Sequence, residues 1–287
     1  MSTRANLTQG TILVTGGANG KTGRRVAQRL RTRGVPVRVG SRSGQPRFDW
    51  DDRATWRPAL TGTTAAYISY FPDIGAPGAP EAIEAFAQAA LDVGAHRLIL
   101  LSGRGEDAAQ RAEQALQDSG AAWTIVRCSW FNQNFSENVF LGPVLAGEVA
   151  LPPDTIPEPF VDADDVADVA VAALTEEGHA GQVYELTGPR LLTWAEAVGE
   201  IAKASGRDIR YVPISLEQFT AGLAEAGEPE ELVSLLAYLF AEVMDGRNAS
   251  LTDGVQRALG REPRGFADYA RRTAATGVWA GELAGHR

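Results

Sequence analysis

This sequence of 287 residues is poor in the side chains that form covalent cross-links and metal sites. Its single cysteine, Cys128, excludes an intramolecular disulfide. Its three histidines lie too far apart in sequence to suggest a metal site. The formal net charge of −9 disfavours binding to a nucleic-acid backbone, which requires clustered basic side chains. We therefore expect no resident metal and no direct nucleic-acid partner.

Long apolar runs are also missing. No stretch approaches the roughly 18 apolar residues that span a bilayer, and residues 1–10 lack the apolar segment of a secretory signal. The 44% apolar and 22% charged residues are ordinary for a globular protein. These features predict a cytoplasmic protein with no membrane partner.

A glycine-rich turn is the most informative feature that is present. Residues 11–23, TILVTGGANGKTG, place an apolar run directly before three spaced glycines and the start of a helical pattern. Glycine lets backbone N–H groups approach a pyrophosphate, and the start of a helix adds a partial positive charge. We therefore expect a dinucleotide to bind here. The candidate cofactor residues of this turn are Gly17, Asn19, Gly20, Lys21, Thr22 and Gly23.

Two other interpretations of the turn stay open. The residues also read GxxxGKT, one residue short of the phosphate loop of nucleotide triphosphatases, and Thr15 occupies the place of that loop's first glycine. Gly23 is expected where a helix packs tightly on a strand in a dinucleotide fold, but a triphosphate loop does not explain it. A glycine turn without any ligand is the third interpretation.

The end of the second predicted strand indicates which dinucleotide binds. NAD sites usually carry an acidic side chain about 20 residues after the glycines, where it accepts from the ribose 2′-hydroxyl. Residues 35–47 contain no Asp or Glu, and Ser41 and Arg42 follow the strand instead, where they could hold a 2′-phosphate. NADP(H) is therefore favoured over NAD(H), with a solvated loop arginine as the alternative for Arg42. Asp49 is a candidate for the adenine amino group, or else a turn or cap aspartate, and Ser69 is a further cofactor candidate.

Strand-like runs alternate with helical patterns, which predicts an α/β fold with a doubly wound parallel Rossmann sheet. The predicted strands are residues 11–15, 35–40, 48–50, 65–69, 97–102, 123–127 and 183–186. The predicted helices are residues 21–33, 80–93, 106–119, 164–175, 193–205, 216–226, 230–244 and 266–276. We expect an NADP-binding domain at 1–188, with 130–160 contributing to the cleft, and a smaller, mostly helical substrate lobe at 189–287. Loops at 72–80 and 152–159 are long enough to border that cleft.

Several segments, taken in order, resemble one family. They are the glycine turn with Arg42, then FDWDDRATWRPAL, HRLILLSGRG, SGAAWTIVRCSWFNQNF, PFVDADDVADVAVAAL and GQVYELTGPRLLTWAEAV. Together they make the chain similar to the NmrA-like atypical short-chain dehydrogenases/reductases, and especially to their quinone-reductase-like branch. The resemblance implies an extended Rossmann domain, NADP(H) and a cleft roofed by the C-terminal lobe. That family includes reductases of quinones and azo compounds as well as redox sensors that bind the dinucleotide without turnover.

The proton-transfer pair of standard short-chain dehydrogenases is missing. None of the six tyrosines is followed four residues later by the lysine that would lower its pKa. Ligands of parallel sheets bind beyond the carboxyl ends of the strands, which makes Tyr70 and Ser102 the catalytic candidates. Tyr70 could donate to an oxyanion or to a loop carbonyl, and Ser102 could orient a nicotinamide or cap a turn. The candidate substrate contacts are Phe71, Arg104, Trp130, Phe131 and Asn134.

The remaining candidates each have a structural alternative. Flat aromatic side chains beside a nicotinamide suit a planar conjugated acceptor, although the same aromatics could be packing residues. Cys128 is expected to pack rather than to react, because no histidine lies near it in sequence. Asp162, Asp164 and Asp165 are expected to mark a helix start, with metal binding as the alternative.

Two functions from different classes follow. The first is an NADP(H)-dependent oxidoreductase that reduces a small conjugated acceptor, such as a quinone or a related carbonyl compound. The second is a non-catalytic redox sensor that reports the NADP+/NADPH ratio to a protein partner, which the missing tyrosine–lysine pair favours. The sequence leaves the substrate and the oligomeric state open.

Overall fold

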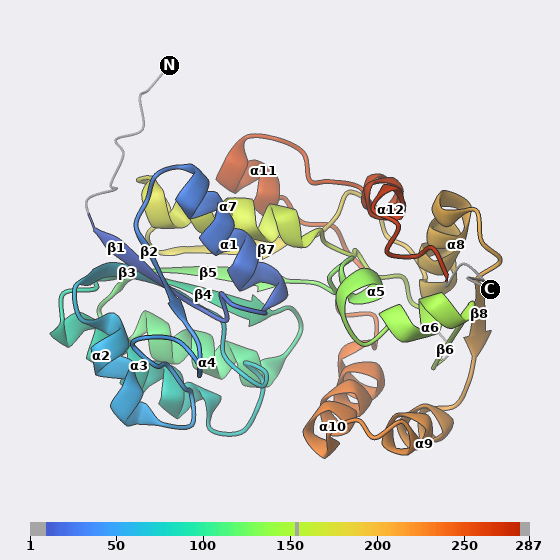
Figure 1. Cartoon of the computed structure of the whole chain (residues 1–287), viewed down its shortest axis with the longest axis horizontal. Coiled ribbons are helices and arrows are strands. Elements are labelled where there is room, and N and C mark those ends of the chain that lie inside the picture. The colour runs from blue at the N-terminus through green and yellow to red at the C-terminus, as the bar shows by residue number, and fades with distance from the viewer. Residues whose placement is uncertain (1–9, 153–154, 282–287) are drawn as a thin grey trace, which may run out of the picture. The chain divides into compact units, whose positions relative to one another are not determined.

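The structure, a computed structural model, describes residues 10–152 and 155–281 (Figure 1). Residues 1–9, considered above for a secretory signal, and residues 153–154 of the predicted loop at 152–159 lie outside the described residues. The chain forms two compact units. Of the described residues, unit 1 comprises 10–128, 163–186 and 252–262, and unit 2 comprises 129–152, 155–162, 187–251 and 263–281. The chain passes between the units after residues 128, 162, 186, 251 and 262. The predicted domain boundary at residue 188 stays a prediction.

Unit 1 is built on a six-stranded parallel sheet, which confirms the predicted doubly wound α/β fold. The strand order is β2-β1-β3-β4-β5-β7, and every neighbouring pair is parallel. The strands are β1 (Thr11–Thr15), β2 (Val37–Gly40), β3 (Thr63–Ile68), β4 (Arg97–Gly103), β5 (Ala122–Cys128) and β7 (Gln182–Leu186). The order reverses between β1 and β3, which is the switch point beside which ligands of such sheets bind.

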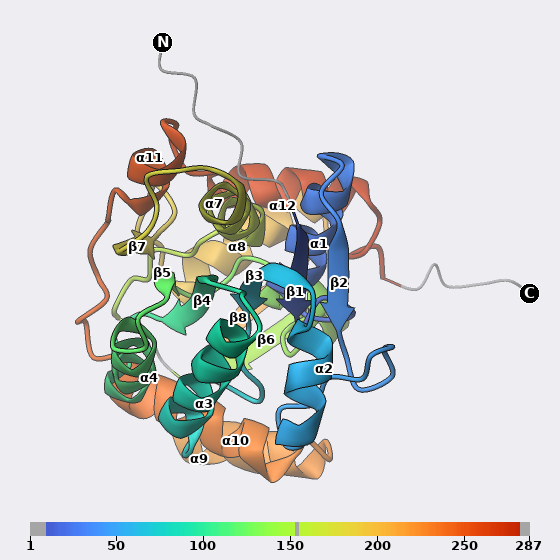
Figure 2. The ribbon, with the colours of Figure 1, turned by 90° about the vertical axis from the view of Figure 1, so that its left-hand side faces the viewer.

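Helices cover both faces of this sheet. Figure 2 shows α1, α7 and α11 on one face and α2, α3 and α4 on the other. These helices are α1 (Lys21–Thr32), α2 (Trp56–Leu60), α3 (Ala79–Asp92), α4 (Asp107–Gln117), α7 (Ala163–Thr175) and α11 (Gly254–Leu259). Each buries an apolar stripe: on α1, Val26, Ala27 and Leu30 are all fully buried. The central strand β1 is apolar on both faces for the same reason, and its residues Leu13 and Val14 are 0% exposed.

The predicted strand at 48–50 is wrong. These residues run through an irregular loop, in which the Phe48 N–H donates to the Ser41 carbonyl over 2.9 Å. Phe48 and Trp50 meet edge to face with ring centroids 5.0 Å apart, and both rings pack against Phe86 of α3. The aromatic residues of this run therefore pack against α3 from a loop, and such packing does not require the hydrogen bonds of a strand.

Unit 2 is mostly helical, with one small sheet that sequence reasoning missed. β6 (Glu148–Leu151) pairs in parallel with β8 (Arg210–Pro213). Two four-residue strands so far apart in sequence carry too little periodicity to be recognised. The helices are α5 (Asn134–Glu137), α6 (Leu141–Ala146), α8 (Trp194–Ser205), α9 (Leu216–Glu225), α10 (Glu230–Tyr238), the π-helical turn Leu239–Val243 and α12 (Phe266–Ala275).

The core of unit 2 is aromatic. The indole of Trp194 is fully buried and contacts the rings of Phe135, Phe140 and Phe160 at centroid distances of 5.1 to 5.6 Å. The Trp279 indole N–H donates to the Phe135 carbonyl over 2.8 Å and ties residues after α12 to α5. Among the described helices of both units, none is long and apolar enough to cross a membrane.

Candidate functional site

The glycine turn lies between β1 and α1, at the switch point of the sheet. A Cβ on Gly20 or Gly23 would lie 2.6 Å from the Gly16 carbonyl oxygen, so side chains have no room there. Gly16 has a φ of +66°, which favours glycine; sequence reasoning left it out although the glycine pair was visible. Gly20 is the N-cap residue of α1, so the helix has no side-chain cap, and its first turn has no acidic residue. A bare turn that leads into a helix start fits a pyrophosphate.

The other candidates of the turn lie around this backbone. Asn19 is exposed, Lys21 is half-buried, and Thr22 is 3% exposed. The side chain of Thr22 is therefore interior. Its contribution to a phosphate site would have to come from its backbone N–H in the first turn of α1.

Thr15 links the glycine turn to the end of β3. Its hydroxyl accepts from the Ser69 N–H over 2.8 Å and lies 3.2 Å from the Ser69 and Tyr67 carbonyl oxygens, to which it can donate. Ser69 itself lies against Gly16, because a Cβ on Gly16 would come within 3.5 Å of the Ser69 hydroxyl oxygen. The structure therefore brings the predicted cofactor residue Ser69 to the glycine turn and gives Thr15 a structural role.

The loop after β2 presents Ser41 and Arg42. Ser41 is half-buried, and Arg42 is exposed with its guanidinium carbon 5.9 Å from the centroid of the Phe71 ring. Asp49 lies in a turn rather than at a strand tip, and its carboxylate accepts from Arg47 over 2.6 Å. The predicted contacts of these residues with the adenosine end of a cofactor stay predictions.

Ser102, at the end of β4, belongs to a buried polar network. Its hydroxyl donates to Glu113 of α4 over 2.6 Å, and Glu113 is 2% exposed. Arg127 of β5 donates to the same carboxylate from Nε over 2.9 Å and to Glu185 of β7 over 2.6 Å. The hydrogen bond from Arg127 to Glu113 raises the pKa of Arg127, with a contribution from Glu185. The network ties the carboxyl ends of three strands to α4.

Sequence reasoning missed Glu113 and Glu185. The available signal was the position of Glu113 in the predicted helix at 106–119, on the same apolar side as Ala109, Ala112 and Leu116. The predicted substrate contact Arg104 joins the same network: it is 7% exposed, and its Nε lies 3.4 Å from Glu185.

Tyr70 and Phe71 follow β3. The Tyr70 ring packs against Trp50 with centroids 5.0 Å apart, and burial, followed by the charge of Asp51, raises the pKa of the Tyr70 hydroxyl. A raised pKa keeps the phenol protonated at neutral pH, so it can donate a hydrogen bond but cannot act as a base. Phe71 is 60% exposed, which is unusual for a large apolar side chain at a strand end.

The other predicted substrate contacts belong to unit 2. Trp130 is half-buried and packs edge to face on Trp194 with ring centroids 5.0 Å apart. Phe131 forms an isolated bridge with Val161, and Asn134 begins α5. Trp130 therefore has a packing role in this unit, and substrate contact by these three residues stays a prediction.

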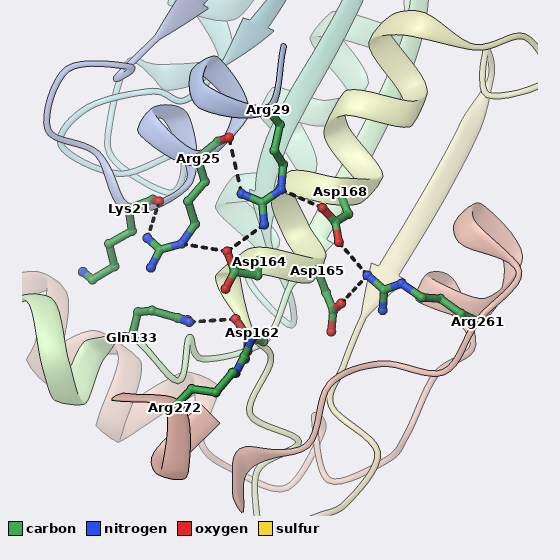
Figure 3. Close-up of polar contacts among 10 residues, drawn as sticks. All are labelled: Lys21, Arg25, Arg29, Gln133, Asp162, Asp164, Asp165, Asp168, Arg261 and Arg272. Atoms are coloured by element: carbon green, nitrogen blue, oxygen red, sulfur yellow. Dashed lines mark hydrogen bonds and ion pairs between the residues drawn. The ribbon is translucent and has the colours of Figure 1, made fainter. Parts of the chain in front are cut away.

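Arginines hold the acidic start of α7 (Figure 3). Asp164 accepts from Arg25 over 3.2 Å and from Arg29 over 2.7 Å, which joins α7 to α1. Asp165, fully buried, pairs with Arg261 over 2.7 Å. Both carboxylates lie in the first turn of α7, as the predicted helix start requires, and guanidinium groups already compensate their charge.

Two further residues of the sequence analysis have structural contacts. Asp162, in unit 2, accepts from Gln133 over 2.7 Å and pairs with Arg272 over 2.6 Å (Figure 3). The Cys128 thiol is buried, and burial raises its pKa. A raised pKa suppresses the thiolate, in agreement with the expected packing role.

These features define a dinucleotide-binding α/β protein. A family model described as NAD(P)H-binding matches residues 17–177, and the chain belongs to this family. An NAD(P)H azoreductase from Xenophilus azovorans is 36% identical over 171 residues, or 57% of each chain, so this chain spans just over half of that protein's length. An agroclavine dehydrogenase from Claviceps fusiformis is 32% identical over 90% of this chain and 96% of its own.

Solved structures share the fold over nearly the whole chain. An NADPH-dependent quinone oxidoreductase from Escherichia coli, solved with NADPH, has a TM-score of 0.72 and 23% identity over 91% of this chain and 99% of its own. NmrA, a negative transcriptional regulator solved with NAD, has a TM-score of 0.70 and 17% identity over 95% and 98%. The resemblance to NmrA-like and quinone-reductase-like proteins is confirmed at the level of the fold, and the family that the sequence shows is the NAD(P)H-binding one.

Proposed function

We propose that this protein is an NADPH-dependent oxidoreductase that reduces a small conjugated acceptor, such as a quinone or a related carbonyl compound. The observation that carries the proposal is the bare glycine turn combined with an acid-free end of β2, where Ser41 and Arg42 stand. The azoreductase and agroclavine dehydrogenase relatives and the NADPH-bound quinone oxidoreductase support a redox role for this family.

Each part of unit 1 has a task in this proposal. Backbone N–H groups at the glycine turn bind the pyrophosphate, and Arg42 with Ser41 binds the 2′-phosphate. When bound, the reduced nicotinamide supplies a hydride to the acceptor. The exposed Phe71 ring offers an apolar surface to a planar acceptor, and the protonated Tyr70 hydroxyl donates a hydrogen bond to its oxygen. Hydrogen bonds from Ser102 and Arg127 to Glu113 join the ends of β4 and β5 to α4.

Calorimetric titration tests the cofactor assignment. Arg42→Ala removes one charge-assisted interaction worth about 1.5–3 kcal/mol, so NADPH affinity falls roughly 10- to 150-fold while NADH affinity stays unchanged. Arg31→Ala, at an exposed arginine on the last turn of α1, is the matched control and leaves both affinities unchanged. Equal losses for NADPH and NADH, or no loss in Arg42→Ala, would refute the role of Arg42.

Stopped-flow oxidation of NADPH tests the activity itself. A panel of quinones and conjugated carbonyl compounds is expected to include acceptors that oxidise NADPH, with a lower rate in Tyr70→Phe, which loses the hydroxyl but keeps the ring. Tight NADPH binding without turnover of any acceptor would contradict the reductase assignment.

A second candidate is a redox sensor without turnover. The missing tyrosine–lysine pair favours it, and so does the fold shared with the transcriptional regulator NmrA. A sensor must bind NADP+ and NADPH with different affinities, since a ligand that binds two states equally shifts no population. Equal affinities for the two forms would exclude this candidate.

A further inference from the structure

A buried carboxyl group that the proposed function does not use lies just beyond the carboxyl end of β4. Glu106 is 7% exposed, and its Oε2 atom is buried without a hydrogen-bond partner among the described residues. The side chain folds back onto the strand end: a Cβ on Gly103 would lie 1.8 Å from the Glu106 Oε1 atom. Glycine at position 103 therefore makes room for this carboxyl.

A second carboxyl group shares the same space. A Cβ built on Gly75 would lie 2.9 Å from the Glu106 Oε2 atom and 3.2 Å from the Asp73 Oδ1 atom, so both carboxyl groups border the same small space. Asp73 follows β3 and accepts from the Gly75 N–H over 2.7 Å. Two carboxyl groups this close do not both ionise easily, and the one without donors retains its proton.

The electrostatic surroundings assign the proton to Glu106. Burial, followed by the charge of Asp73, raises the pKa of Glu106 to about 8. Burial also raises the pKa of Asp73, but the Gly75 N–H counteracts this by stabilising the carboxylate. Arg104, which lies between β4 and Glu106 in the chain, is paired with Glu185. The raised pKa therefore favours a protonated Glu106 beside Asp73 at neutral pH.

We propose that Glu106 is the proton donor of the reaction, replacing the tyrosine–lysine pair that this chain lacks, and that Asp73 is its positioning residue. The inference rests on the proposed function. Glu106 and Asp73 follow β4 and β3, at the edge of the sheet beyond which ligands of this fold class bind.

The step balances as follows. The acceptor gains a hydride from NADPH at one atom, and its oxygen gains the proton from the Glu106 carboxyl, directly or through one water. The products are NADP+, the reduced neutral acceptor and a Glu106 carboxylate. Repulsion from Asp73 then favours return of a proton to Glu106 from solvent.

The first test needs no turnover. In full-length protein labelled with ¹³C at the glutamate carboxyl carbons, NMR titration is expected to show one carboxyl with a midpoint above pH 7. The signal is absent from Glu106→Gln and remains in Glu84→Gln, which changes an exposed glutamate of α3. Asp73→Asn removes the neighbouring charge and moves the midpoint to lower pH. A spectrum in which every glutamate titrates near pH 4.5 overturns the proposal.

The second test compares two acceptors. A quinone needs a proton when it is reduced, whereas a triarylmethyl cation becomes neutral by hydride addition alone. Glu106→Gln is expected to lower the ratio of the quinone rate to the cation rate at least tenfold, because general acids contribute about 10²–10⁴-fold. A structural defect would lower both rates together.

The outcomes separate the two proposals. Turnover of both acceptors with an unchanged rate ratio in Glu106→Gln overturns the proton-donor role alone. No turnover of either acceptor by the wild-type protein overturns the proposed function, and the proton-donor role with it.

Discussion

Replacing Glu106 by glutamine is expected to change how the stability of this protein depends on pH. In the native state the Glu106 carboxyl keeps its proton up to about pH 8, whereas an ordinary glutamate loses it near pH 4.5. Between these values the native state binds more protons than the unfolded chain, so the free energy of unfolding falls as pH rises. Glu106→Gln keeps the size of the side chain, cannot ionise, and removes this dependence.

The expected magnitude follows from the shift. From pH 5 to about pH 8 the Glu106 carboxyl stays protonated in the native state but is ionised in the unfolded chain. At about 1.36 kcal/mol per pH unit, the free energy of unfolding of the wild type falls by on the order of 4 kcal/mol relative to the variant. For a chain of this size that difference corresponds to roughly 8–16 °C in the melting temperature. The variant is therefore expected to be more stable than the wild type at pH 9, and the difference should shrink toward pH 5.

Thermal melts of wild type, Glu106→Gln and Glu84→Gln at half-unit intervals between pH 5 and pH 9 measure this directly. The comparison between variants cancels the titration of groups that do not interact with Glu106, and Glu84→Gln should run parallel to the wild type. If the difference between wild type and Glu106→Gln did not change with pH, Glu106 would titrate alike in the folded and unfolded states and the reasoning would fail.

Four further substitutions test other parts of the structure. Glu113→Gln leaves Arg127 with one carboxylate fewer in a buried network and should destabilise the protein by about 3–5 kcal/mol in urea unfolding; a loss below 1 kcal/mol would contradict the network's importance. Gly23→Ala places a Cβ 2.6 Å from the Gly16 backbone and should abolish NADPH binding measurable by calorimetry. In Gly199→Ala, on α8, the new Cβ meets nothing within 4 Å, so the free energy of unfolding should rise by about 0.5–1 kcal/mol. Trp279→Phe loses the hydrogen bond to Phe135 and should cost about 1 kcal/mol by the same unfolding assay, and an unchanged midpoint would argue against that bond.

Local features of the sequence predicted the glycine turn and the parallel sheet. The glycine turn follows from backbone geometry, because only glycine fits where β1 turns into α1. The parallel sheet follows from unbroken apolar runs such as residues 11–15, which can be buried on both faces. The strand predicted at 48–50 failed because aromatic residues suit a strand and a packed loop equally well, and the choice depended on Phe86, far along the chain.

The sequence by itself determined the fold class, the glycine turn and the acid-free end of β2, since these depend on residues close together in the chain. The tertiary structure alone decided which buried charges meet. Ser102, Glu113, Arg127 and Glu185 come from three strands and a helix, and Asp73 reaches Glu106 only because parallel strands end at a common edge. The energy of a buried carboxyl depends on its solvation and on neighbours that chain topology supplies, so no local pattern could distinguish Glu106 from an ordinary surface glutamate.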